Sequence, residues 1–287
     1  MKKSLLVTLA LSLVLVAAGC SSTTEETTEE VTTEVEEAAE TVEEDAAEAE
    51  ETTEAETDAD AEAETETEDA SATDVMSYAD YVAAEVDTEV CVETYVQAKQ
   101  SWWEDNGVGQ ATFYTQNEDG AFFIYNMPCT EEDYEKLVPG TKIKVTGYKS
   151  EWSGEVEIVD ATYEIEDTDT FVAEAKDVTS LLGTDELIDS QNQFVSFKGM
   201  TVEAANDAGD AFLYKYDGSG TEGDDLYFNV SLDGNTYSFT VESYLCDKDS
   251  DVYKAVQNLK VGDVVDMEGF LYWYEGVNPH ITSITVQ

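Results

Sequence analysis

The stretch LVPGTKIKVTGYKSEWSG, residues 137–154, indicates a repeated fold, because a variant of it, LKVGDVVDMEGFLYWYEG, occurs again at residues 259–276. The two copies keep one leucine and three glycines in register while most polar residues between them change. The matched pairs are Leu137/Leu259, Gly140/Gly262, Gly147/Gly269 and Gly154/Gly276. A glycine at a fixed place inside a strand marks a bulge, a bend or a close approach of two backbones. We therefore expect the same bent hairpin in both halves of the chain.

Both copies alternate apolar and polar residues, as half-buried strands do. Upstream, EVCVETYVQA and FVSFKGMTVEA alternate in the same way, and each is followed by two strands that turn at NEDG or LDGN. The segments CTEEDYEKL and CDKDSDVYKAVQNL are expected to be short helices. The polar residues that differ between the copies are expected to face solvent.

Three strands, a helix and two strands are the order of the five-stranded Greek-key barrel called the OB-fold. We predict a mainly β protein with two tandem five-stranded OB-like Greek-key barrels, each with a short helix between strands 3 and 4, after a disordered acidic linker. The predicted domains are residues 75–168 and 169–287. An SH3-like barrel or an irregular sandwich is the alternative architecture.

The pattern G-x-x-V-x-V-x-G, with its glycine-containing turn and apolar strand, is similar to bacterial OB-fold domains of the nucleic-acid-binding, anticodon-binding type. The resemblance implies a ligand surface on strands 2 and 3 and on the loops that join strands 1 to 2 and 4 to 5. Many members of that family stack bases on aromatic side chains and hold phosphates with basic groups. The chain departs from this pattern, because the lysines of the first copy are replaced in the second. The pairs are Lys142/Val264, Lys144/Asp266 and Lys149/Leu271.

The N-terminus, MKKSLLVTLALSLVLVAAGC, has two lysines, an apolar run over residues 5–18, and Cys20. This is the pattern of a secretory signal, and the run is shorter than the roughly 20 residues of a membrane span. The chain resembles a bacterial lipoprotein, because VAAGC is similar to a lipobox. The resemblance implies a signal peptide over 1–19, a lipid on Cys20, and anchoring to the bacterial cell membrane on its extracytoplasmic face.

Residues 20–74 are predicted to be a disordered acidic linker. Residues 21–74 contain 24 acidic residues, no lysine and no aromatic residue, so they cannot bury enough apolar surface to offset the entropy of ordering. A helical stalk is the alternative, and like charges four residues apart oppose it. We expect the linker to act as a tether between the membrane and the folded part.

The folded part is strongly acidic. Beyond residue 74 there are 42 acidic residues and 11 lysines, and the whole chain has no arginine. Proteins that bind nucleic acid neutralise phosphates with clustered basic residues, so the composition argues against a nucleic-acid partner. It favours cations, basic peptides or simple solubility.

Loop aromatic residues are the candidate ligand-binding residues. Trp102 and Trp103 fall in the first connection of domain one, Trp152 in its last, and Trp273 and Tyr274 in the matching last loop of domain two. Aromatic rings beside polar groups suit sugars and peptides. The alternatives are that these rings fill the ends of the barrels or form a contact between the domains.

Other candidate sites are weaker. Cys91 and Cys129 are the pair that could form a disulfide within one domain. The acidic loop at 206–225 could wrap Ca²⁺ but lacks the EF-hand spacing, so no metal site is predicted. His280 falls inside the last strand and is expected to be structural. No catalytic motif is present.

We therefore expect no enzyme activity and no cofactor. The expected function is that of a non-enzymatic binding or adaptor lipoprotein, with a cell-wall glycan, a peptide or a protein as its partner. The alternatives are a structural accessory module of the envelope and, against the charge, a nucleic-acid binder.

Overall fold

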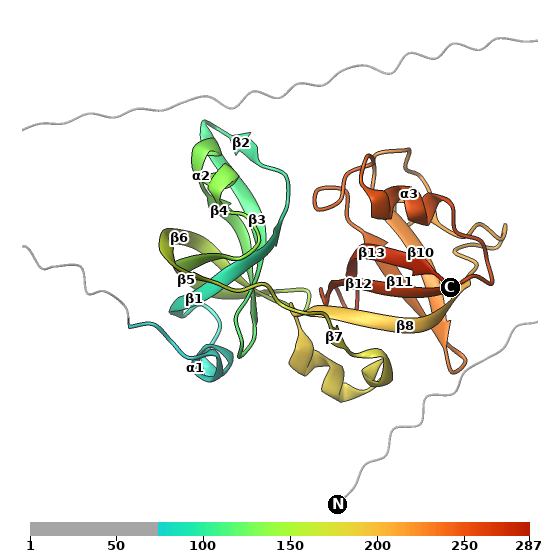
Figure 1. Cartoon of the computed structure of the whole chain (residues 1–287), viewed down its shortest axis with the longest axis horizontal. Coiled ribbons are helices and arrows are strands. Elements are labelled where there is room, and N and C mark those ends of the chain that lie inside the picture. The colour runs from blue at the N-terminus through green and yellow to red at the C-terminus, as the bar shows by residue number, and fades with distance from the viewer. Residues whose placement is uncertain (1–73) are drawn as a thin grey trace, which may run out of the picture. The chain divides into compact units, whose positions relative to one another are not determined.

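The computed structural model describes residues 74–287, which form two successive β-barrels (Figure 1). The predicted signal peptide, Cys20 and the predicted linker before residue 74 lie outside the described residues. The elements of the first barrel are α1 Tyr78–Ala83, β1 Glu89–Lys99, β2 Trp103–Asp105, β3 Val108–Gln116, β4 Ala121–Pro128, α2 Glu131–Lys136, β5 Thr141–Trp152 and β6 Glu155–Thr170.

The second barrel repeats this order with extra short elements. Its elements are β7 Lys176–Asp177, the 3₁₀ helices η1 Thr179–Leu181 and η2 Asp185–Ser190, β8 Phe194–Glu203, β9 Leu213–Tyr214, β10 Leu226–Leu232, β11 Asn235–Val241, α3 Asp251–Gln257, β12 Val264–Phe270 and β13 His280–Val286. None of the helices in residues 74–287 has both the length and the apolar character needed to cross a bilayer.

Five strands close each barrel. In the first, the order of neighbours is β1-β5-β6-β4-β3, and β3 pairs again with β1. In the second, the order is β8-β12-β13-β11-β10, and β10 pairs again with β8. One neighbouring pair in each ring is parallel, β4 with β6 and β11 with β13. This is the OB-like arrangement, and the helix lies between the third and fourth barrel strands in both halves, so the predicted fold class is confirmed.

The repeated glycines allow two backbones to approach closely. A Cβ atom on Gly147 would lie 2.7 Å from the carbonyl oxygen of Val159, and one on Gly269 would lie 2.2 Å from that of His280. The strand register shifts at both places. The two glycines therefore mark the same bulge in β5 and β12, as the repeat predicts.

Helix α1 is not predicted by the sequence pattern, and Lys149 on β5 holds its end. The ammonium group of Lys149 donates to the carbonyl oxygens of Tyr81, Val82 and Ala84 at 3.0, 2.9 and 2.8 Å. Lys149 is 7% exposed. The expectation that the variable polar residues of the repeat face solvent is therefore wrong for Lys149, because its three donors are used by a helix end.

Each barrel has its own apolar core, with Phe113, Ile124 and Ile143 in the first and Phe197, Phe228 and Phe239 in the second. Strand β6 continues to Thr170, and β7 begins at Lys176. The domain limits at 168 and 169 stay a prediction.

Candidate functional site

A small aromatic core joins the two barrels. Tyr114 on β3 stacks on Phe270 of β12, with ring centroids 4.5 Å apart and an interplanar angle of 26°. Phe123 on β4 contacts the ring of Tyr272, just beyond β12, at 5.4 Å. Tyr114, Phe123 and Phe270 are all buried. The contact therefore has the character of a protein interior.

Tyr114 also forms a hydrogen bond with His280, the first residue of β13. The Tyr114 hydroxyl lies 2.6 Å from Nδ1 of His280, and the Tyr272 ring stacks on the imidazole at 4.3 Å. Burial lowers the pKa of His280 to about 3 and raises that of Tyr114. Both groups are neutral at pH 7, and an imidazole with its proton on Nε2 accepts the Tyr114 hydrogen at Nδ1. The prediction of a structural histidine fits this environment.

Glu155, the first residue of β6, makes a second junction between the barrels. Its Oε2 accepts hydrogen bonds from the Trp273 amide at 2.9 Å and from the Gln191 side chain at 3.2 Å. Glu155 is completely buried, and burial raises its pKa to about 8. The carboxyl therefore carries a proton through much of the neutral range.

A cleft of about 560 Å³ opens beside the aromatic core, and both barrels line it. The first barrel contributes Gln100, Ser101, Trp103, Phe123, Tyr125 and Asn126, and the second contributes Glu242, Tyr244, Tyr272 and His280. Trp103, Tyr125 and Tyr244 are 43%, 46% and 66% exposed. The cleft thus presents accessible aromatic rings next to amide and carboxyl groups.

Hydrogen bonds across the barrels fix the floor of the cleft. The amide of Ser101 donates to the carbonyl oxygen of Tyr244 at 2.8 Å. Gln100 donates from its side chain to Oε2 of Glu242 at 3.1 Å. Burial raises the pKa of Glu242 to about 7. These contacts hold a carboxyl group in place before any ligand arrives.

The adjacent residues Trp102 and Trp103 have different environments. Trp102 packs against the core of the first barrel, and its Nε1 donates to the carbonyl oxygen of Cys129 at 3.0 Å. A Cβ atom on Gly109 would lie 2.2 Å from the Trp102 ring, so that glycine makes room for the indole. Trp103 begins β2 and lines the cleft. Among the predicted ligand-binding residues, Trp103 is the one that the structure brings to the cleft.

The other predicted aromatic residues lie where the last hairpin turns of the two barrels touch. The rings of Trp152 and Tyr274 are 5.1 Å apart, and the Glu275 amide donates to the carbonyl oxygen of Ser153 at 2.7 Å. Trp273 packs beside Gly154. The two copies of the repeat therefore meet each other at their tips. Trp152 and Tyr274 remain about half exposed.

The cleft residues that sequence reasoning missed are Tyr125, Tyr244, Tyr272 and Glu242. Tyr125 is the one exposed residue of FFIY in β4, and the three residues before it are buried. Tyr244 and Glu242 follow β11, where no local pattern separates them from an ordinary turn.

Cys91 and Cys129 are free thiols in the structure, as is Cys246. Cys129 belongs to the core of the first barrel, whereas Cys91 is buried but is not a member of that cluster. Burial raises the pKa of the Cys129 thiol to about 11. The disulfide considered from the sequence is therefore not formed here.

Carboxyl groups of the acidic loop accept hydrogen bonds from backbone amides of the same loop. Asp217 accepts from the Ser219 amide at 3.0 Å, and Asp224 accepts from the Thr221 amide at 2.8 Å. Within residues 74–287, no group of three or more histidine, cysteine or acidic side chains is placed to hold a metal ion.

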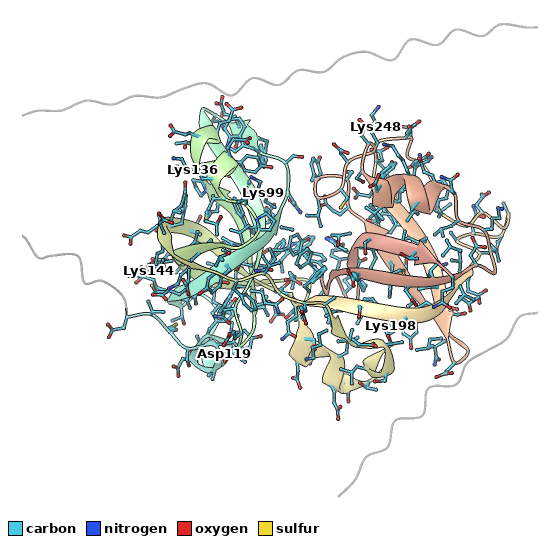
Figure 2. All side chains as sticks on the ribbon, viewed as in Figure 1. Lys99, Asp119, Lys136, Lys144, Lys198 and Lys248 are labelled. Atoms are coloured by element: carbon cyan, nitrogen blue, oxygen red, sulfur yellow. The ribbon has the colours of Figure 1, made fainter. Side chains whose placement is uncertain are left out.

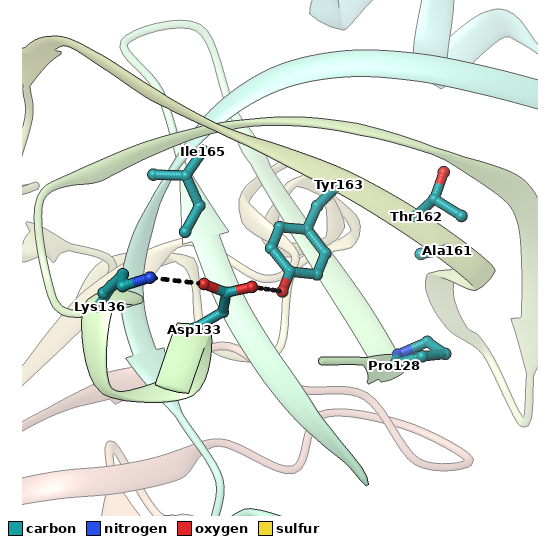
Figure 3. A pocket seen from close by; sticks show the side chains of 7 residues that line it. All are labelled: Pro128, Asp133, Lys136, Ala161, Thr162, Tyr163 and Ile165. Atoms are coloured by element: carbon teal, nitrogen blue, oxygen red, sulfur yellow. Dashed lines mark hydrogen bonds and ion pairs between the residues drawn. The ribbon is translucent and has the colours of Figure 1, made fainter. Parts of the chain in front are cut away.

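A broader hollow beside α2, of about 610 Å³, has its polar groups already paired (Figure 3). Asp133 lies between Lys136, at 2.9 Å, and the Tyr163 hydroxyl, at 3.1 Å. The lysines labelled in Figure 2 are spread over both barrels. The cleft is therefore the better candidate site.

No known family model matches the chain, and no curated protein matches it significantly. Among solved structures, the chain is similar to a murine DNA-binding protein bound with double-stranded DNA. The identity is 13%, the TM-score is 0.32, and the match covers 68% of this chain and 94% of the other. It is also similar to p202 HIN1 in complex with 12-mer double-stranded DNA, at 12% identity and a TM-score of 0.30, over 70% and 94% of the two chains.

A third similar structure is a Replication Protein A heterotrimer bound to single-stranded DNA, at 13% identity and a TM-score of 0.27, over 69% of this chain and 48% of the other. These structures are complexes with DNA, which corrects the expectation that a nucleic-acid partner is unlikely. That expectation rested on the net charge and on the absence of arginine, although proteins also hold nucleic acid by stacking bases on aromatic rings.

Proposed function

We propose that the protein is a membrane-anchored, extracytoplasmic lipoprotein that acts as a non-enzymatic binding module for a glycan. The ligand binds in the cleft between the two OB-like barrels. The observation that carries the proposal is the cleft itself, where exposed aromatic rings from both barrels surround fixed amide and carboxyl groups.

A sugar ring matches this arrangement. It offers an apolar face to an aromatic ring and hydroxyl groups to hydrogen-bonding side chains. Trp103 and Tyr125 supply ring faces from one barrel, and Tyr244 supplies one from the other. Asn126 and Glu242 supply hydrogen-bonding groups on the two sides.

The anchoring part of the proposal is supported by the sequence of residues 1–20. A positively charged start, a short apolar run and a cysteine after small residues fit export and lipidation at Cys20. An acidic tether would then hold the binding module away from the leaflet.

The non-enzymatic part is supported by the state of the ionisable groups in the cleft. His280 has its Nδ1 engaged by Tyr114 and a pKa of about 3, so it is a poor base near neutral pH. Glu242 is the one carboxyl among the cleft residues. General acid–base chemistry on a glycosidic bond ordinarily uses two carboxyls.

Isothermal titration calorimetry on the full-length chain in detergent tests the proposal. The ligands are neutral cell-wall oligosaccharides, short peptides, and single- and double-stranded DNA. We expect saturable binding of oligosaccharide that Trp103→Ala weakens at least tenfold and that Trp152→Ala, the matched control, leaves within twofold. Binding of DNA alone, with the same dependence on Trp103, would replace the glycan by a nucleic acid.

A structural accessory role in the envelope is the second candidate function. It is favoured by the contact between Trp152 and Tyr274, where the loop aromatic residues pack the barrels against each other. If this is the whole function, no ligand should protect Trp103 from quenching by iodide.

A further inference from the structure

The cleft contains a buried carboxyl group, that of Glu242, whose oxygens can accept further hydrogen bonds. Glu242 is 8% exposed. Its Oε2 accepts from Gln100 and its Oε1 accepts from the Tyr244 amide, each at 3.1 Å. A carboxylate has about four lone-pair positions, so this group is oriented by two hydrogen bonds and retains acceptor capacity.

No cation neutralises Glu242 within the described part of the chain. None of the ion pairs found in residues 74–287 includes it, and no lysine lines the cleft. The carboxylate of Asp225 adds a negative charge nearby, and its Oδ1 accepts hydrogen bonds from the amide and hydroxyl of Ser243 at 2.8 and 2.6 Å. The environment of Glu242 is therefore electronegative and lacks a counter-ion.

The aromatic rings of the cleft add to this attraction for positive charge. Cations bind favourably over the faces of tryptophan and tyrosine, and tryptophan is the strongest of these partners. Trp103, Tyr125 and Tyr244 have accessible rings, and Tyr272 forms part of the wall. Charge and aromatic character therefore favour the same kind of ligand group.

We propose that the cleft recognises a protonated amine carried on a sugar ring, that is, an amino sugar whose nitrogen is not acylated. The amine binds Glu242, the sugar faces lie against the aromatic rings, and hydroxyl groups bond to Gln100 and Asn126. This inference rests on the proposed function, because it names the ligand group for the same cleft.

The test compares two sugars that differ only at nitrogen. Calorimetry of the full-length chain is carried out at pH 7 with a glucosamine trisaccharide and with its fully N-acetylated counterpart. We expect the free amine to bind at least tenfold more tightly. Glu242→Gln should remove this preference, because the glutamine side chain carries no negative charge to attract the amine.

Glu268→Gln on the exposed face of β12 is the matched control. It makes the same chemical change outside the cleft and should leave the tenfold preference intact. If Glu242→Gln fails to fold, Trp103→Ala on the exposed rim provides a second variant. It should weaken the binding of both sugars.

The outcomes separate the inference from the proposed function. Equal affinity for the two sugars would overturn the inference while glycan binding stands. If a lysine tripeptide binds and neither sugar does, both the amino-sugar assignment and the proposal of a glycan ligand would be overturned. A preference that persists in Glu242→Gln would also overturn it, since the amine would then be recognised elsewhere.

Discussion

The hydroxyl of Tyr114 and Nδ1 of His280 are 2.6 Å apart, and this hydrogen bond joins β3 of the first barrel to β13 of the second. The two residues are separated by 166 positions in the sequence. Both side chains are buried in an aromatic environment formed with Phe270 and Tyr272. The bond is thus the polar centre of the contact that places the two walls of the cleft.

Replacing Tyr114 by phenylalanine should destabilise the protein. The change keeps the ring but leaves Nδ1 of His280 buried without a partner, which costs about 1–3 kcal/mol. Denaturant unfolding followed by circular dichroism measures the change. Tyr125→Phe, on the exposed face of β4, is the control and should alter stability by less than about 0.5 kcal/mol. An equal effect of the two substitutions would show that the bond to His280 contributes nothing.

Acid should destabilise the folded state through His280. Its pKa is about 3 when folded and about 6.5 when unfolded, so below pH 6.5 the unfolded chain takes up a proton that the folded chain does not. Stability from this residue is therefore full above pH 6.5 and falls towards pH 3, by at most about 1.4 kcal/mol per pH unit.

The His280→Gln variant isolates that contribution. Glu155 and Glu242 have raised pKa values and act in the opposite direction, stabilising the fold as the pH falls from about 8 or 7 towards their unfolded values. Glu155 and Glu242 are present in the wild-type protein and in the His280→Gln variant alike. The difference in unfolding free energy between the wild-type protein and the variant, measured from pH 4 to 8, should therefore shrink below pH 6.5. A difference independent of pH would contradict the account of a buried neutral imidazole.

Lys149→Met should weaken the attachment of α1. The substitution leaves three carbonyl oxygens at the helix end without their donor and is expected to cost about 2 kcal/mol or more. Hydrogen exchange should show faster opening of residues 78–84. Lys144→Met on the same strand is the control, because the ammonium group of Lys144 takes part in none of the ion pairs found within residues 74–287. A comparable loss of protection from hydrogen exchange at residues 78–84 in both variants would argue against a specific role of Lys149.

Cys20→Ser should release the protein from the membrane fraction. The proposal places the lipid on the sulfur of Cys20, and serine offers no thiol for that attachment. Metabolic labelling with a fatty-acid analogue, followed by fractionation, measures both the lipid and the location. Serine substitution at Cys246, a thiol of the second barrel, should change neither. Retained label in Cys20→Ser would place the modification elsewhere.

The fold could be predicted from the repeat. The site could not, because it depends on contacts between residues far apart in the sequence, which no local pattern indicates. Gly147 and Gly269 could be assigned to a bulge from spacing alone, because the requirement acts within one hairpin. Lys149 could not be assigned, since its role arises from a helix 65 or more residues earlier. Trp102 and Trp103 look alike in sequence, and only the presence of Gly109 and Cys129 beneath one of them separates core from cleft.

The cleft itself required the placement of one barrel on the other. Trp103 and Glu242 come from different barrels, and Gln100 reaches Glu242 across 142 positions. The contact between the repeat tips was foreseen as one use of the loop aromatic residues, but the sequence did not distinguish it from a ligand surface.

Nuclear magnetic resonance of the indole N–H signals tests directly whether the sugar binds in the cleft. The chain has four tryptophans, and four Trp→Phe variants assign their signals. On titration with the glucosamine trisaccharide, we expect a saturable shift of the Trp103 signal, smaller changes at Trp102, and none at Trp152. A shift at Trp152 with an unchanged Trp103 signal would contradict this expectation, because the ligand would then bind at the repeat tips and not in the cleft.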